Sequence, residues 1–227
     1  MMLTVFLIAV LIMSAVLHEV AHGYVAFRLG DNTAKDLGRL TLNPLKHLDP
    51  IGSVLLPVLM IFSGLRFFIA WAKPVPFNPF NLRDAINGPM KVALAGPLTN
   101  LALVIIFGVL ALLLPVGLDQ KFLLVQTYLS GDNNAVLALM AGSLLNSLYV
   151  MTFIICLING ALFAFNLIPV PPLDGSKVLL RFLPSSSQEF FYRYETYGFF
   201  VLIFLLWFGV IDIILMPIIS VILSVFF

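Results

Sequence analysis

Charged residues are scarce in this sequence: they occupy only 10% of the 227 positions, whereas soluble domains average about 25%. Hydrophobic residues make up 61% of the chain, and the mean hydropathy is +1.09. This composition excludes an ordinary soluble domain and predicts an integral membrane protein. The lipid bilayer is therefore an expected partner, and no nucleic-acid partner is expected.

Cysteine is almost absent as well. The single cysteine, Cys156, falls in an apolar stretch, so a disulfide framework is excluded and a packed core thiol is expected. No lysine or arginine precedes the first apolar stretch, which is typical of a retained signal anchor. The connections between apolar stretches do not exceed about 25 residues, which is too short for an inserted soluble domain. We therefore expect one membrane-embedded domain over residues 1–227.

Long apolar stretches are what the chain has instead. The first has 25 residues and would form about 37 Å of helix, enough to cross a bilayer with tilt. A helical turn, or an extension of the fourth stretch (Gly142–Leu167), is expected at Ala135–Met140. After the fifth stretch (Tyr197–Met216), Pro217 predicts a kink or a partial sixth helix. The five stretches are Leu3–Phe27, Ile51–Leu65, Val92–Leu114, Gly142–Leu167 and Tyr197–Met216.

The distribution of basic residues indicates how these stretches are threaded. Ile51–Leu65 is short for a span, at about 22 Å, and is broken by Pro57. If it does not cross, eleven basic residues share one side and only Lys121 lies on the other; if it crosses, the division is five against seven. The positive-inside rule favours a re-entrant segment, with the N-terminus outside and the basic loops in the cytoplasm.

Two connecting segments, Asp36–Asn43 and Phe67–Phe77, contain β-forming residues punctuated by glycine and proline. They predict short strands at the cytoplasmic membrane face. The expected fold is thus an all-α integral membrane protein: a bundle of about five to six membrane segments, with a re-entrant segment and short β-strands at that face.

Histidine is also rare, and two of the three histidines form the pattern His-Glu-x-x-His at His18–His22, inside the first apolar stretch. A helix places residues four apart on one face, so both imidazoles point the same way. This is the zinc-ligand spacing of metallopeptidases, in which the glutamate acts on a water activated by the metal. By composition, the pattern would arise by chance in roughly one of two thousand such chains.

A catalytic zinc site needs a third protein ligand. Asp174 follows the fourth apolar stretch, beyond three prolines that cannot continue a regular helix, so it can fold back toward the bundle. The threading argument places His18 and Asp174 in the same leaflet. Without the other motifs, Asp174 would be read as a simple turn residue.

Three motifs occur together and in order: the His18–His22 pattern, Ala95–Asn100 (Ala-Gly-Pro-Leu-Thr-Asn), and Asn166–Gly175 with its Leu-Asp-Gly end. In these the chain resembles the site-2 protease family of intramembrane zinc metalloproteases (peptidase family M50), of the small prokaryotic type without PDZ or CBS domains. The resemblance covers residues 1 to about 180. It implies a catalytic core over that range, followed by C-terminal helices at 190–227.

The resemblance further implies one zinc ion bound by His18, His22 and Asp174. It assigns Glu19 as the general base and Asn166 as a group that stabilises the oxyanion. The expected substrates are transmembrane proteins, cut near the cytoplasmic leaflet of the cell membrane. A metal-ion or proton transporter is the alternative, because histidine and aspartate in membranes also mark ion paths. His47 is either an interfacial turn residue or a group near the metal or its entrance.

Overall fold

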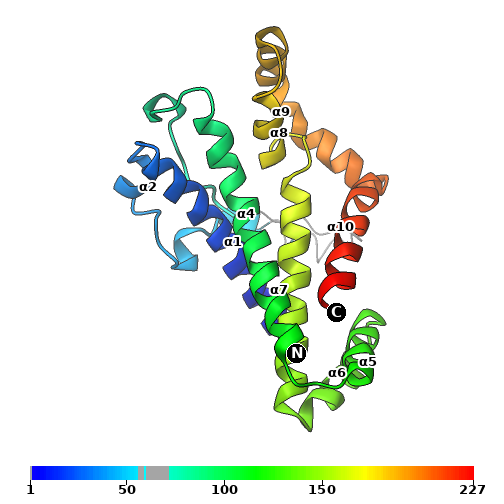
Figure 1. The fold of residues 1–227 in the computed structure, drawn as a ribbon. Coiled ribbons are helices and arrows are strands. Elements are labelled where there is room, and N and C mark those ends of the chain that lie inside the picture. Colours follow the sequence, from blue (N-terminus) through cyan, green and yellow to red (C-terminus); the bar gives the residue numbers. More distant parts are fainter. Residues whose placement is uncertain (1, 56–58, 60–71) are drawn as a thin grey trace.

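The computed structural model describes residues 2–55, 59 and 72–227 (Figure 1). Within this part of the chain, three helices are long and apolar enough to cross a membrane: α1 (Met2–Arg28), α4 (Gly88–Leu113) and α7 (Leu144–Asn166). They correspond to the first, third and fourth apolar stretches, whose helical nature was correctly predicted. A bent pair of C-terminal helices provides a fourth candidate span.

The three helices run side by side, and α4 packs against both α1 and α7 (Figure 1). One face of α4 carries small residues at helical spacing, which lets neighbouring backbones approach closely. A Cβ added at Gly108, for example, would lie 2.5 Å from the Phe226 ring of the last helix. The buried residues along this face are Ala93, Gly96, Asn100, Val104, Gly108 and Ala111.

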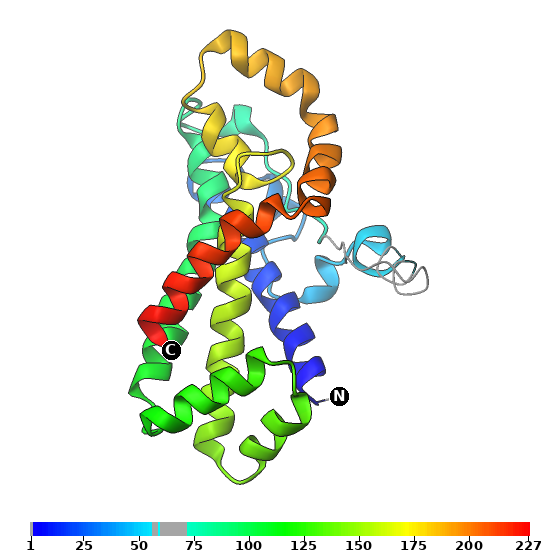
Figure 2. The same ribbon diagram turned by 90° about the vertical axis from the view of Figure 1, so that its right-hand side faces the viewer.

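Two short helices, α5 (Leu118–Leu129) and α6 (Asn133–Ala141), close the end of the bundle nearest the N-terminus (Figure 2). The sequence had indicated only a helical turn or an extension of α7 here. The structure instead separates α6 from α7, because the Ser143 hydroxyl accepts the Asn146 N–H and caps a new helix. Lys121 donates to the carbonyls of Ala111 and Leu112 and so satisfies the exposed end of α4.

The C-terminal helices α9 (Ser185–Trp207) and α10 (Val210–Phe226) form the bent pair, with an angle of 72° between their apolar parts. Of the two alternatives for this region, the structure has a further helix: α10 follows α9 and contains Pro217 in its interior. The chain bends at Gly209, whose φ of 68° is left-handed. Such a φ ends a helix abruptly and is tolerated by glycine, whereas a proline removes a single helical hydrogen bond.

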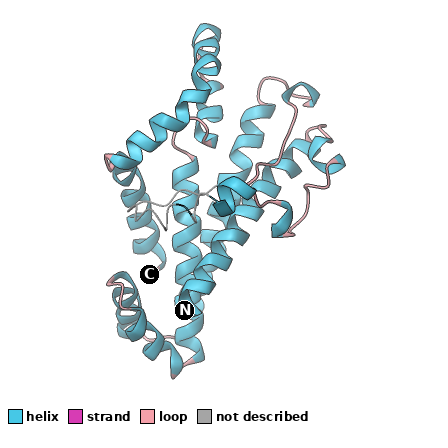
Figure 3. Cartoon of the chain, turned by 180° about the vertical axis from the view of Figure 1, so that it is seen from behind, coloured by secondary structure: helices cyan, strands magenta, loops and turns pink. Residues whose placement is uncertain are grey.

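The predicted short strands are wrong for the described residues (Figure 3). Asp36–Asn43 begins at the end of α2 (Thr33–Asp36) and continues as turns, with Gly38 at a φ of 63°. The second segment is described only from residue 72, and there a single antiparallel bridge joins Ala72 to Leu48. Pro74 and Pro76 follow directly, and since proline has no N–H they cannot extend a ladder.

Most of the re-entrant segment expected at Ile51–Leu65 lies outside the described residues. Its beginning forms a short π-helix, η2 (Pro50–Leu55). The Leu48–Ala72 bridge and a hydrogen bond from Lys73 N–H to the His47 carbonyl, 2.8 Å long, bring the flanking chains together. The loops after α1 and before α4 therefore lie at one end of the bundle, as the charge distribution predicted.

Candidate metal centre

Two histidines of α1 meet one aspartate of α8 (Asp174–Leu180) inside the bundle. The Nε2 atoms of His18 and His22 are 3.0 Å apart, and the Oδ2 atom of Asp174 lies 3.1 Å from each of them. All three side chains are buried, with 6%, 8% and 8% of their residue surfaces exposed. Residues 156 positions apart in the chain thus converge on one point.

Hydrogen bonds at the far side of each imidazole fix which nitrogen carries the proton. His22 donates its Nδ1–H to the carbonyl of Val92, 2.7 Å away. His18 donates its Nδ1–H to Oδ1 of Asn100, 2.6 Å away. The two Nε2 atoms of neutral imidazoles are then unprotonated and face each other and a carboxylate oxygen.

Three lone-pair-bearing atoms this close together repel one another unless a proton or a metal cation lies between them, and the group could hold a metal ion. Tetrahedral zinc bound at about 2.0–2.1 Å holds its ligands about 3.3 Å apart, close to the observed separations. Two imidazoles and one carboxylate are also the kind of donor set that leaves one position for water in a catalytic zinc site. The residues present therefore fit a zinc ion.

Gly96 of α4 leaves the space that such an ion needs. A Cβ added there would lie 2.5 Å from both Nε2 atoms. In the sequence, Gly96 was notable only as part of the Ala95–Asn100 motif. Its position opposite both imidazoles gives this glycine a more specific importance, because any larger residue would enter the site.

The turn between α7 and α8 brings Asp174 back to α1. α7 ends at Asn166, the proline-containing turn follows, and α8 begins at Asp174, in agreement with the unwinding expected from the prolines. A Cβ at Gly175 would collide with the Leu167 carbonyl, so a glycine is needed for this close approach. Ser176 donates to the Leu173 carbonyl, 2.6 Å away, and stabilises the turn.

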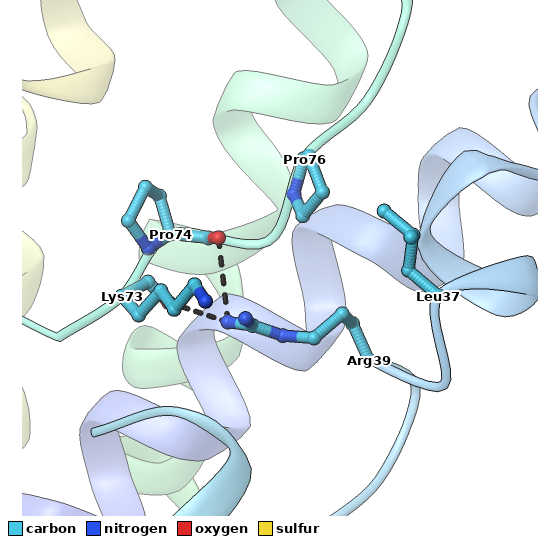
Figure 4. Close-up of a pocket in the computed structure, with 5 residues that line it drawn as sticks. All are labelled: Leu37, Arg39, Lys73, Pro74 and Pro76. Atoms are coloured by element: carbon cyan, nitrogen blue, oxygen red, sulfur yellow. Dashed lines mark hydrogen bonds between the residues drawn. The ribbon is translucent and has the colours of Figure 1, made fainter. Parts of the chain in front are cut away.

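Glu19, between the two histidines in sequence, is half-buried and contacts a separate segment. Its Oε2 accepts the Val75 N–H at 2.8 Å. Arg39 holds this segment in place by donating from Nη2 to the carbonyls of Lys73 and Pro74, at 2.8 and 3.3 Å. A cavity of about 340 Å³ lies beside it. Figure 4 shows the residues that line it: Leu37, Arg39, Lys73, Pro74 and Pro76.

Asp31 anchors the same segment to the end of α1. Its carboxylate accepts hydrogen bonds from the Asn78 N–H, the Asn81 side chain and Thr33, and the residue is fully buried. Burial acts to raise the pKa of Asp31, but these hydrogen bonds outweigh it and hold the pKa below its usual value. Asp31 therefore contributes to the position of the chain that contacts Glu19.

Two other candidates from the sequence have contacts elsewhere. Asn166 is half-buried and donates from Nδ2 to the Leu162 carbonyl of its own helix at 2.9 Å. His47 is buried, and its Nε2 lies 2.8 Å from the Thr41 carbonyl. Among the described residues, it is not in the metal-binding group formed by His18, His22 and Asp174. The contacts of His47 agree with the turn residue that the sequence allowed.

Several residues around the site were missed or undervalued in the sequence. The Val92 carbonyl has no sequence signal, because any residue supplies a backbone oxygen. Ser14 does have one: it precedes His18 by four residues, as His18 precedes His22, and so shares their helix face. Asn159 lies outside the three sequence motifs, yet it hydrogen bonds to Asn100 directly behind His18.

The motif order and the geometry agree with a comparison with known families. The sequence profile of peptidase family M50 matches residues 82–209, more than half of the chain. The chain belongs to this family. The match includes Asn100, Asn166 and Asp174, whereas the two histidines lie before it.

Curated relatives of this M50 peptidase cover most of its length. YwhC of Bacillus subtilis, named provisionally as a zinc metalloprotease, is 35% identical over 201 residues, which are 88% of this chain and 79% of YwhC. Rip2 of Mycolicibacterium smegmatis, with the same provisional name, is 32% identical over 89% of this chain and 66% of Rip2. Rip2 of Mycobacterium tuberculosis is 30% identical over 82% of this chain and 60% of its own length. No solved structure matches the chain.

Proposed function

We propose that His18, His22 and Asp174 hold the zinc ion of this metalloprotease and that Glu19 is the general base. The observation that carries the proposal is the convergence of two unprotonated Nε2 atoms and a carboxylate oxygen within 3.1 Å. Family membership makes the chain a peptidase, and the names of YwhC and Rip2 point to zinc as its metal. This assignment replaces the transporter alternative.

The chain's own residues would divide the chemistry as follows. Zinc, when bound, acts as a Lewis acid and can lower the pKa of a water molecule to about 7. Glu19 would accept the proton of the attacking water and later deliver a proton to the leaving amine. Asn166 would donate from its amide to the developing oxyanion. To do so, it must release the Leu162 carbonyl, which it contacts at 2.9 Å.

The substrates we propose are membrane-anchored proteins. The support is that the site lies between helices that are long enough to cross a bilayer. Helix carbonyls are held in i→i−4 hydrogen bonds and must be freed before attack. Cleavage should therefore be favoured near residues that weaken helices, such as glycine, asparagine or proline. A substrate panel in which these residues are replaced by leucine should be cleaved more slowly.

We also propose that residues 1–227 form a single domain embedded in a prokaryotic cytoplasmic membrane. The metal site of this domain lies near the cytoplasmic side. The support is the positive-inside rule, together with the basic loops that gather at the end opposite Lys121 (Figure 1). Phe80 at this end is 95% exposed and Leu118 at the other is 83% exposed. A cysteine at position 80 should react with an impermeant maleimide only in inverted vesicles. A cysteine at position 118 should react only in right-side-out vesicles.

The central test compares Glu19→Gln with Asp174→Ala in protein purified in detergent. Glu19→Gln should keep one zinc per chain and lose about 10²–10⁴-fold in cleavage rate of a tagged single-span substrate, the usual contribution of a general base. Asp174→Ala should lose both zinc and cleavage. Full activity of the glutamine variant, or stoichiometric zinc in Asp174→Ala, would refute the proposed roles.

A further inference from the structure

A continuous chain of buried polar side chains lies behind His18 and returns, through two neighbouring helices, to Ser14 of the same helix. Asn100 Nδ2 donates to Oδ1 of Asn159 at 2.8 Å, and Asn159 Nδ2 donates to the Ser14 hydroxyl at 3.0 Å. Asn100 and Asn159 are fully buried, and Ser14 is 4% exposed. The chain connects α1, α4 and α7, which are the three long helices around the site.

The direction of this chain is set at one end by a backbone carbonyl. Asn159 Nδ2 also donates to the Ile155 carbonyl at 2.9 Å, and a carbonyl can only accept. The amide nitrogen of Asn159 must therefore face Ser14 and Ile155, and its oxygen must face Asn100. This in turn requires Asn100 to present its nitrogen to Asn159 and its oxygen to His18.

We propose that Asn100 and Asn159 are positioning residues that fix the tautomer of His18 for metal binding. The Asn100 oxygen can only accept from His18, so the imidazole proton is held at Nδ1 and the lone pair of Nε2 faces Asp174 and His22. His22 obtains the same tautomer from the Val92 backbone. Of the two histidines, only His18 has a tautomer that depends on a neighbouring side chain. This inference rests on the proposed metal site.

If Asn100 only fills space between helices, its substitutions should follow a different order of effects than if it orients His18. Leucine has the same number and branching of side-chain heavy atoms as asparagine and suits an apolar helix interface. Packing alone therefore favours Asn100→Leu over Asn100→Asp, which buries a charge. An orienting role reverses this order. Aspartate still accepts the His18 Nδ1–H, as carboxylates do behind many metal-bound histidines, whereas leucine cannot.

The test is zinc affinity, measured by chelator competition on the purified full-length protein. Losing such an orienting hydrogen bond typically weakens metal binding about 10–100-fold. Asn100→Leu should show this loss and Asn159→Leu a smaller one. Asn100→Asp should bind zinc more tightly than Asn100→Leu, because it still accepts the His18 Nδ1–H even though it no longer donates to Asn159. Asn146→Leu is the matched control on α7, because Asn146 donates to the Leu139 carbonyl away from the site.

Wild-type affinity in both leucine variants, or weaker binding in Asn100→Asp than in Asn100→Leu, would overturn the inference. If Asn100→Leu does not fold, Asn159→Leu against Asn159→Asp carries the same comparison, since aspartate at position 159 still accepts from Asn100. Failure of the proposed function would look different, because the wild-type protein itself would then bind no zinc. A protein that binds zinc with unaffected variants refutes only the orienting role.

Discussion

Gly96→Ala offers a sharp test of where the metal lies. The added methyl carbon would sit 2.5 Å from the Nε2 atoms of both His18 and His22, and ordinary contact begins at 3.4 Å. The two imidazoles must therefore move by about 0.9 Å, or α1 must separate from α4 by a similar amount. Metal–ligand distances tolerate about 0.2 Å. We expect zinc affinity to fall at least 100-fold, with overpacking costing about 1–3 kcal/mol of stability.

The assay is zinc stoichiometry and competitive zinc affinity in detergent, with thermal unfolding measured on the same samples. Gly108→Ala is the matched control on the same helix, because its methyl group would lie 2.5 Å from the Phe226 ring, away from the site. Both variants should lose stability, but only Gly96→Ala should lose zinc. Stoichiometric, wild-type zinc binding in Gly96→Ala would refute the placement of the ion between the imidazoles and α4.

Three further predictions concern the surroundings of the site. Gly175→Ala should weaken zinc binding by displacing Asp174, because its methyl group collides with a carbonyl at the end of α7, whereas Gly142→Ala, with open space around it, should not. Asn166→Ala should lower kcat about 10²–10³-fold with zinc content and KM unchanged, the usual loss of one oxyanion donor; an unchanged kcat would remove Asn166 from the mechanism. Asp31→Asn should lower the melting temperature at pH 7 by removing a charged acceptor worth about 1.5–3 kcal/mol. Because the pKa of Asp31 is lowered on folding, the wild type should lose this advantage as the pH falls below about 4, and a constant difference down to pH 2 would contradict the argument.

The long helices and the histidine pair could be predicted because their signals are local. Helical spacing places His18 and His22 on one face. The prolines after α7 allow Asp174 to return to that face, but only the family's motifs made it a candidate ligand instead of a turn residue. The strands could not be predicted correctly, because β-forming residues favour an extended backbone but do not ensure that a second segment pairs with it. At Pro74 and Pro76 the missing N–H groups prevented such pairing.

Residues that act through distant partners were harder to recognise. Asn159 lies on α7, 59 positions from Asn100, and only the packing of the helices shows that their amides meet. The sequence allowed a kink at Pro217 or a further helix, but the break between α9 and α10 lies at Gly209, whose φ of 68° is not visible in the sequence. Backbone groups such as the Val92 carbonyl have no sequence signal at all.

The hydrogen bond between Glu19 and the Val75 N–H has a consequence for the resting enzyme. The bond takes up one of the roughly four lone-pair sites of the carboxylate, so Glu19 can still accept a proton from water while residues 73–77 stay in place. Lifting residues 73–77 away from α1 would remove a hydrogen bond to a charged group, worth about 1.5–3 kcal/mol. One amide between two prolines thus keeps the proposed base in a single orientation before any substrate arrives.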